Sequence, residues 1–243
     1  MLLLACLLAV ATPALNAEHR VKIICNSASR GPIEELKPWI STHAHAQLEI
    51  QCGSTAEGVE RLNRGELADV AILTKEAVQA LDKKGMVRTQ RDLALSDVGI
   101  AIADGAPRPI MNSTEDFSSF LRATPSIGYT TGVSGKHLAR IIARLGLDEV
   151  MKPKSIVVDG GGAAKLLSSG KVAAAVQQIS ELRADGARNI VPLPEAVQMH
   201  TMLTIAVLNS APDVDKANAI LRALTSVEAN PVYQRWGLVP LHP

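Results

Sequence analysis

The chain has 243 residues, enough for one large domain or for two domains of about 100 residues each. Aromatic residues make up only 2% of it, so the side chains on which single-stranded nucleic acid would stack are nearly missing. Its 25 basic and 24 acidic residues are spread through the sequence and give a formal net charge of +1. We therefore expect no nucleic-acid partner, and any charge selectivity has to be local.

Residues 1–17 are uncharged, rich in Leu and Ala, and end in small residues just before Glu18. This pattern predicts a cleaved secretory signal peptide, because the apolar run is too short to span a membrane. We expect the mature protein to begin near Glu18 and to be exported. A lipid anchor at Cys6 and a start codon further upstream are the alternatives, since no basic residues precede the apolar run.

From Val21 onward, short β-like runs alternate with helical stretches. The first series comprises expected strands at 21–25, 48–52 and 70–73, with helices at 32–41, 56–64 and 75–83. A strand at 98–103 leads through a turn-rich segment into a second series, with strands at 126–129, 155–158 and 173–177 and helices at 135–145 and 163–169. The chain returns through an apolar strand at 202–208 to a C-terminal helix at 213–225.

Repeated strand–helix units of this length predict an α/β fold with parallel sheets and right-handed crossovers. The second series predicts a second lobe that the chain enters and leaves through strands, which would form a hinge. We expect lobe I to comprise residues 18–96 plus 197–243, and lobe II residues 97–196. We expect such a hinge-closing molecule to be a monomer.

Two cysteines, Cys25 and Cys52, remain once the signal segment is removed, and each ends a predicted strand. Thiols in such positions are usually buried as small hydrophobic groups. An exported protein can also oxidise such a pair, so a disulfide is the alternative.

The first predicted strand is followed by Ser27, Ser29 and Arg30, just before the first predicted helix. Such an end brings backbone N–H groups, hydroxyls and a fixed positive charge together, which suits an anion at a helix N-terminus. Strand carboxyl ends in open α/β sheets also face the ligand crevice. In the alternative interpretation, the serines cap the helix and Arg30 pairs with Glu34 on its surface.

The same design recurs at other strand ends, where hydroxyls and basic side chains precede a helix. The candidates there are Ser54, Thr55, Thr74, Lys75, Thr131, Ser134, Gly135, Lys136 and His137. Lys75 would neutralise a second carboxylate on the ligand. The alternative for Lys75, Lys136 and His137 is a solvated position in a first helical turn.

No metal or other cofactor is expected. His43 and His45 are two residues apart, with no Cys or acidic residue nearby to complete a tetrahedral set. Gly160-Gly161-Gly162 precedes a helix but lacks the full dinucleotide-binding fingerprint.

Short motifs follow one another in order along nearly all of the mature chain. They are Asn26-Ser27-Ala28-Ser29, Cys52-Gly53-Ser54-Thr55, Gly65-Glu66-Leu67-Ala68-Asp69-Val70, Gly132-Val133-Ser134-Gly135, Arg144-Leu145-Gly146-Leu147, Asp159-Gly160-Gly161-Gly162 and Tyr233-Gln234-Arg235-Trp236-Gly237-Leu238. In this order they resemble the periplasmic molybdate-receptor branch of the type II solute-binding proteins. The resemblance implies two Rossmann-like lobes that close on a small anion and deliver it to an ABC permease.

The chain departs from this branch at two places. Its members place a tyrosine on a second-lobe strand where this chain has Gln177-Gln178, of which we expect Gln178 to face the cleft. They also hold molybdate with neutral donors, whereas Arg30 follows the first serines here. Because a guanidinium matches a carboxylate, an organic acid is favoured over molybdate as the ligand.

Two functions fit these residues. The first is a transport receptor for a small organic polycarboxylate. The second is an isomerase on the same scaffold, similar to the aconitate isomerases of this group, which interconvert trans- and cis-aconitate by an allylic proton shift. Arg30 and Lys75 would clamp the substrate, and His137 or Lys136 would move the proton. A receptor needs no base, so a cleft-facing group with a pKa near neutrality would favour the enzyme.

Overall fold

The computed structural model describes residues 20–159 and 162–242. The predicted signal peptide at 1–17, with Cys6, lies outside the described residues, as do Gly160 and Gly161. Across the described part of the chain, no helix is both long and apolar enough to cross a membrane.

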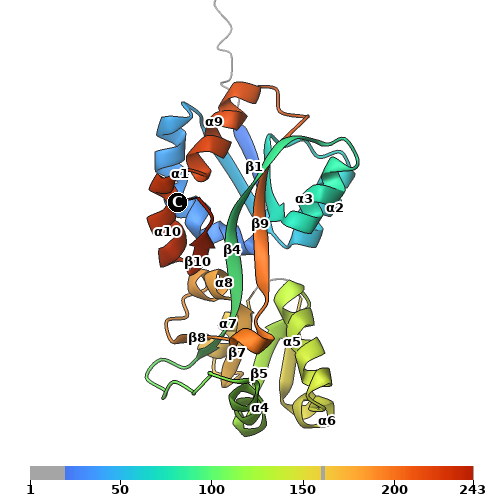
Figure 1. Cartoon of the computed structure of the whole chain (residues 1–243), viewed down its shortest axis with the longest axis vertical. Helices are drawn as coiled ribbons and strands as arrows, with labels where there is room; N and C mark the ends of the chain where they lie inside the picture. Colours follow the sequence, from blue (N-terminus) through green and yellow to red (C-terminus); the bar gives the residue numbers. More distant parts are fainter. Residues whose placement is uncertain (1–19, 160–161, 243) are drawn as a thin grey trace, which may run out of the picture.

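The described strands form one ten-stranded sheet with the order β2-β1-β3-β9-β4-β7-β5-β6, and β8 and β10 both pair with β4 (Figure 1). The elements of the upper lobe in Figure 1 are β1 (Val21–Asn26), α1 (Ser27–His43), β2 (Leu48–Gly53), α2 (Thr55–Asn63), β3 (Val70–Thr74), α3 (Lys75–Asp82), α9 (Val214–Leu224), α10 (Asn230–Arg235) and β10 (Leu238–Pro240). Those of the lower lobe are α4 (Thr114–Ala123), β5 (Ile127–Thr130), α5 (Val133–Arg144), α6 (Asp148–Met151), β6 (Ser155–Val158), α7 (Ala163–Ser168), β7 (Ala174–Gln178), α8 (Ile179–Ala184) and β8 (Ile190–Pro192). The two-lobed α/β fold expected from the sequence is confirmed.

Two long antiparallel strands, β4 (Val87–Ile102) and β9 (His200–Leu208), run between the lobes (Figure 1). β4 pairs with β9 as far as Asp97, which lies opposite His200. From Val98 onward it pairs instead with β7 and β8. The division into lobes at 96/97 and 196/197 stays a prediction.

Parallel strands carry the predicted site in each lobe. β1 pairs in parallel with β2 and β3, and β5 pairs in parallel with β6 and β7. Parallel strands place their carboxyl ends at one edge of a sheet, where the following helices begin. Each lobe therefore gathers its polar strand ends at one edge.

The parallel strands β1 and β3 are buried on both faces, which explains their nearly continuous apolar runs, whereas the edge strands β2 and β6 are more exposed. In β1, Ile23 and Cys25 pack in one cluster with residues of α1 and α9, whereas Ile24 packs on the opposite face with Leu62 and Val78. Lobe II has a separate core around Phe117, Ile127 and Leu138. Separate cores allow each lobe to hold its half of the site rigidly.

Several elements differ from the sequence expectation. Helix α1 begins at Ser27 rather than at residue 32, because the side chain of Asn26 caps it there, and Pro32 lies inside the helix instead of at its start. Strand β4 is longer than the expected 98–103, since its mostly polar first half also pairs with β9. Helices α4 and α8 were not predicted.

Cys25 and Cys52 lie opposite each other in the β1–β2 pair, with their Cα atoms 4.4 Å apart, and form a disulfide. The expectation of two buried thiols was therefore wrong. The bond links two strands that both end at the edge of the sheet where α1 and α2 begin.

Candidate functional site

A cavity of about 360 Å³ lies between the lobes. Residues of both lobes and of strand β9 line it: Asn26, Ser27, Ala28, Ser54, Thr55, Ala56, Thr74, Thr130, Thr131, Gly132, Val133, Ser134, Lys136, Gln178, Glu181 and Thr201. Its size lies within the range of about 300 to 1,000 Å³ typical of small-molecule pockets.

Four helices of eight or more residues begin at this cavity. Their N-cap residues all line it, namely Asn26 for α1, Ser54 for α2, Thr74 for α3 and Gly132 for α5. Helix α5 has no side-chain cap, so its first backbone N–H groups are left for another acceptor. The converging positive helix ends create a site that favours an anion.

Hydroxyl groups supplement these N–H donors. Ser54 Oγ accepts from Glu57 N at 3.1 Å, and Thr74 Oγ1 accepts from Ala77 N at 3.4 Å. Thr130 Oγ1 accepts from Gly132 N at 3.2 Å. A hydroxyl carries one proton besides its lone pairs, so each of these three groups can still donate to a ligand.

Most of the predicted site residues come together at the cavity. Those that line it are Ser27, Ser54, Thr55, Thr74, Thr131, Ser134, Lys136 and Gln178. They come from five separate strand ends, so the rule that strand carboxyl ends meet at the crevice placed them correctly. Their contact with a ligand stays a prediction.

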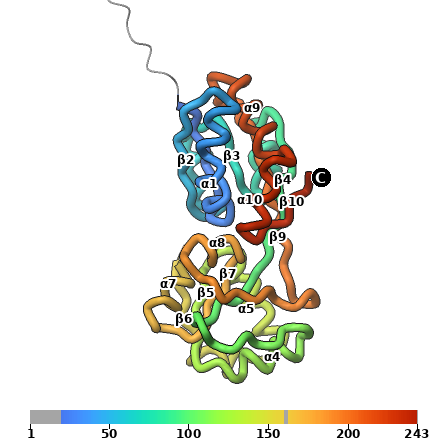
Figure 2. The backbone as a smooth tube through the Cα atoms, turned by 90° about the vertical axis from the view of Figure 1, so that its left-hand side faces the viewer, coloured from blue at the N-terminus to red at the C-terminus, as the bar shows by residue number. Residues whose placement is uncertain are grey.

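Arg30 and Ser29 are not among the lining residues. Arg30 Nη2 instead lies 2.8 Å from Asp185 Oδ1, which joins α1 of lobe I to the end of α8 in lobe II. These two helices lie against each other across the junction (Figure 2). Ser29 is buried and donates to the capping oxygen of Asn26 at 2.7 Å. Arg30 thus neither lines the cavity nor pairs with Glu34, the two positions that the sequence suggested for it.

Lys75 and Gly135 also lie away from the cavity lining. Lys75 Nζ is 2.6 Å from Asp92 Oδ2, an ion pair that ties α3 to β4. Gly135 is buried, and a Cβ atom there would lie 1.6 Å from the carbonyl oxygen of Thr130. Glycine at this position lets α5 begin tightly against the end of β5.

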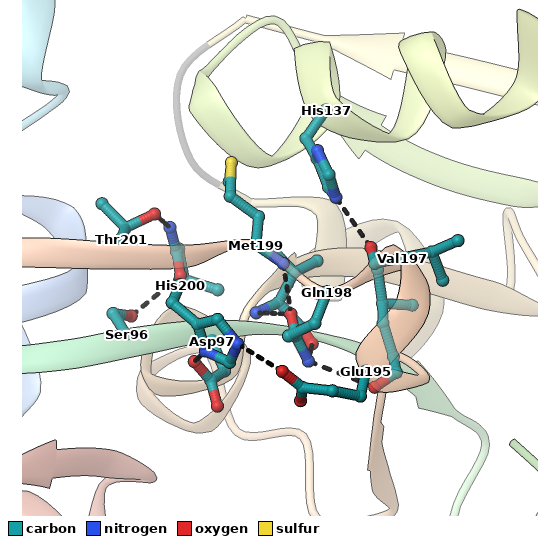
Figure 3. Close-up of polar contacts among 12 residues, drawn as sticks. Ser96, Asp97, His137, Glu195, Val197, Gln198, Met199, His200 and Thr201 are labelled. Atoms are coloured by element: carbon teal, nitrogen blue, oxygen red, sulfur yellow. Dashed lines mark hydrogen bonds and ion pairs between the residues drawn. The ribbon is translucent and has the colours of Figure 1, made fainter. Parts of the chain in front are cut away.

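Two histidines, His137 and His200, make their hydrogen bonds outside the cavity lining. His137, on α5, contacts the carbonyl oxygen of Val197 through Nε2 at 2.8 Å and does not line the cavity (Figure 3). His200 bridges Asp97 and Glu195 through its two ring nitrogens, at 2.7 and 3.0 Å (Figure 3). Hydrogen bonds to Glu195 and Asp97 raise the pKa of His200. His137 is thus not among the lining residues, and its expected contact with a ligand stays a prediction that this position does not support.

Gln178 lines the cavity as expected and also ties the lobe junction together. Its side-chain amide bonds to Ser96 Oγ at 2.8 Å and to Thr201 Oγ1 at 2.9 Å, in either amide orientation. Ser96 lies on β4 and Thr201 on β9, so Gln178 connects the cavity to both long strands.

Glu181 is the ionisable residue that the sequence analysis missed. It lies in the first turn of α8, is partly buried and lines the cavity. Gln177 Nε2 donates to its Oε2 at 2.7 Å. Burial, reinforced by Asp185, raises the pKa of Glu181 to about 7, against the opposing effects of the Gln177 hydrogen bond and Arg30.

A simple signal would have identified Glu181. It follows Gln178 by three residues at the carboxyl end of a parallel strand, the same kind of position that led to Ser54 and Thr74. Asn26 and Thr201 also line the cavity without having been proposed. In residues 20–159 and 162–242, no group of three or more His, Cys, Asp or Glu residues is arranged to hold a metal.

Comparison with known proteins gives one family and several similar folds. Residues 21–239 match the family model for bacterial extracellular solute-binding proteins. A protein from Pseudomonas sp named aconitate isomerase is 28% identical over 251 residues, which cover 99% of this chain and 96% of that protein.

Two solved structures are similar in fold. The periplasmic molybdate-binding protein of Azotobacter vinelandii superposes with a TM-score of 0.75 at 14% identity, covering 90% of this chain and 99% of that one. The sulfate-binding protein SubI of Mycobacterium tuberculosis H37Rv superposes with a TM-score of 0.72 at 14% identity, covering 93% and 88%.

Proposed function

The chain belongs to the bacterial extracellular solute-binding proteins, and on this premise we propose that it binds a small organic polycarboxylate in the cavity between its lobes. The observation that carries the proposal is the convergence of four helix N-termini on one cavity. Together with Lys136 and the hydroxyl donors, they provide several separate places for negatively charged oxygens.

The distribution of these donors favours a polycarboxylate over one tetrahedral oxyanion. Asn26, Ser54 and Thr74 lie at strand ends of lobe I, whereas Gly132 and Lys136 belong to lobe II. A ligand with carboxylates on opposite sides can engage both lobes at once. The relative named aconitate isomerase points to the same ligand class, although Arg30 and Lys75 no longer support it.

As a transport receptor, the protein would be exported to the periplasm, close on this ligand and deliver it to an ABC permease. Closure would bring the two half-sites onto opposite ends of the ligand, which is how such a molecule gains selectivity.

A second candidate is an isomerase acting on an unsaturated tricarboxylate such as aconitate. One feature favours it: the carboxyl group of Glu181 lines a cavity built for anions. A receptor gains nothing from a second negative charge beside its ligand, because like charges repel. An enzyme that moves a proton requires such a group.

The binding proposal is tested with Lys136→Met, because Lys136 is the one cationic side chain among the described residues lining the cavity. We expect the affinity for trans-aconitate, measured by isothermal titration calorimetry, to fall at least about tenfold, the loss typical of a charge-assisted hydrogen bond.

Lys171→Met, at an exposed position of the same lobe outside the cavity, is the matched control and should bind like the unaltered protein. Thermal stabilisation by citrate, molybdate and sulfate, measured in parallel, ranks the ligand classes. Stronger stabilisation by molybdate than by every carboxylate would contradict the proposal.

A further inference from the structure

Two ionisable side chains are found among the described residues that line the cavity, Lys136 and Glu181. The other lining side chains carry hydroxyl, amide or apolar groups. A lysine is ordinarily protonated and serves best as a fixed positive charge for a carboxylate. A proton that must leave carbon and return to it therefore has one suitable carrier at this site, Glu181.

The surroundings of Glu181 fix its position. Gln177 is buried; its Nε2 donates to Glu181 Oε2 at 2.7 Å, and its Oε1 accepts from Ala163 N at 3.1 Å. Since both ends of the amide are engaged, Gln177 holds one carboxylate oxygen in place. Glu181 also lines the cavity, so its carboxyl group borders the space that a ligand would fill.

We propose that Glu181 is the catalytic residue that removes and returns a proton in the isomerisation of a bound unsaturated tricarboxylate. The inference rests on the proposed function that the cavity binds such a ligand.

The reaction balances without a further reactant. In trans-aconitate, a CH₂ group lies between a carboxylate and the double bond. The Glu181 carboxylate takes one proton from this carbon, and the C–H electron pair shifts so that the double bond moves by one position. The protonated Glu181 then returns the proton to the far carbon, which gives cis-aconitate when the new double bond forms in the cis geometry.

Other groups of the cavity can stabilise the negative charge that develops when the proton is removed. Removing the proton pushes negative charge onto a carboxylate of the substrate, and donors already aimed at that carboxylate stabilise the charge. Lys136 and the uncapped start of α5 provide such donors.

The proton affinity of Glu181 also matches this task. The pKa of the group is raised to about 7, which keeps both of its protonation states accessible near neutral pH. The charged groups acting on it are Asp185 on its own helix and Arg30 on α1, with Lys136 of α5 across the same cavity. The carboxylate is the active form for proton removal, so turnover should rise with pH through this pKa.

The test compares Glu181→Gln with the unaltered protein in the conversion of trans- to cis-aconitate. Glutamine keeps the size of the side chain and an oxygen for Gln177, but it cannot carry the proton. We expect at least about a 100-fold loss of turnover. Thermal stabilisation by trans-aconitate should remain.

Glu115→Gln removes an exposed carboxylate of lobe II outside the cavity and should retain full turnover. Turnover by Glu181→Gln at the unaltered rate would overturn the inference. So would loss of both ligand stabilisation and turnover, since that result would assign Glu181 to binding. Stabilisation of the unaltered protein without any turnover overturns the proton-transfer role and leaves the binding proposal intact. The absence of any stabilisation overturns the binding proposal itself.

Discussion

At the scale of single residues, Glu181 differs most from the rest of the cavity. The other lining side chains are hydroxyl, amide or apolar groups and one lysine, whereas Glu181 carries an ionisable carboxyl group among them. Its raised pKa means that the folded chain holds a proton that the unfolded chain releases. The free energy of unfolding must therefore vary with pH, because Glu181 binds protons differently in the folded and unfolded chain.

The sign of this dependence follows from the direction of the shift. Between the ordinary pKa of 4.5 and about 7, the folded state binds more protons than the unfolded state, so the contribution of Glu181 to stability falls as pH rises. Glutamine does not ionise. We expect Glu181→Gln to be more stable than the unaltered protein by about 1 to 3 kcal/mol near pH 8, and by much less near pH 5.

Urea unfolding of both proteins at about pH 5 and pH 8 measures this difference. A stability gain that is equal at the two pH values would show that Glu181 titrates as an ordinary exposed glutamate.

At the scale of elements, the disulfide between β1 and β2 is the main covalent constraint in the described structure. It joins residues 27 positions apart, and a cross-link over a loop of this length typically stabilises a fold by about 3 kcal/mol. Both strands lead into helices whose N-termini line the cavity. The disulfide therefore supports the lobe I half of the site.

We expect the double variant Cys25→Ala/Cys52→Ala to lose about 2 to 4 kcal/mol of unfolding free energy. A reductant should lower the Tm of the unaltered protein and leave that of the double variant unchanged. Detection of two free thiols in the oxidised, unfolded protein would contradict the disulfide.

Much of the secondary structure was predictable because it follows from local patterns. The strand at 155–158 and the helices at 56–64, 75–83 and 213–225 agree with the structure to within one or two residues. Helix α8 has six residues, too few to show a periodic pattern, and the first half of β4 is recognisable as a strand only beside β9.

At the scale of the whole molecule, Arg30 and Asp185 form an ion pair between the lobes. The side chain of Arg30 is 44% exposed and that of Asp185 7%, so the pair contributes modestly, by about 0.2 to 1 kcal/mol. It helps to hold α8 of lobe II against α1 of lobe I. We therefore expect Arg30 to affect the site through the contact between the lobes and not through contact with the ligand.

We expect Arg30→Ala to lower the affinity for trans-aconitate by no more than about fivefold, the equivalent of 1 kcal/mol. Calorimetry measures the affinity, and small-angle scattering of the ligand-free variant should show a larger radius of gyration. Arg188→Ala, which removes an exposed arginine of lobe II, is the control. A loss above about 100-fold would place the Arg30 guanidinium on the ligand.

The sequence by itself determined the α/β class, the two series of strands and helices, and the polar strand ends that line the cavity. These features depend on local periodicity and on residues next to one another in the chain. Only the tertiary structure decided that Arg30 pairs with Asp185, that Lys75 pairs with Asp92, that Cys25 bonds to Cys52, and that Glu181 lines the cavity. Each of these outcomes joins segments far apart in sequence or depends on how the two lobes face each other, and local patterns carry no information about that arrangement.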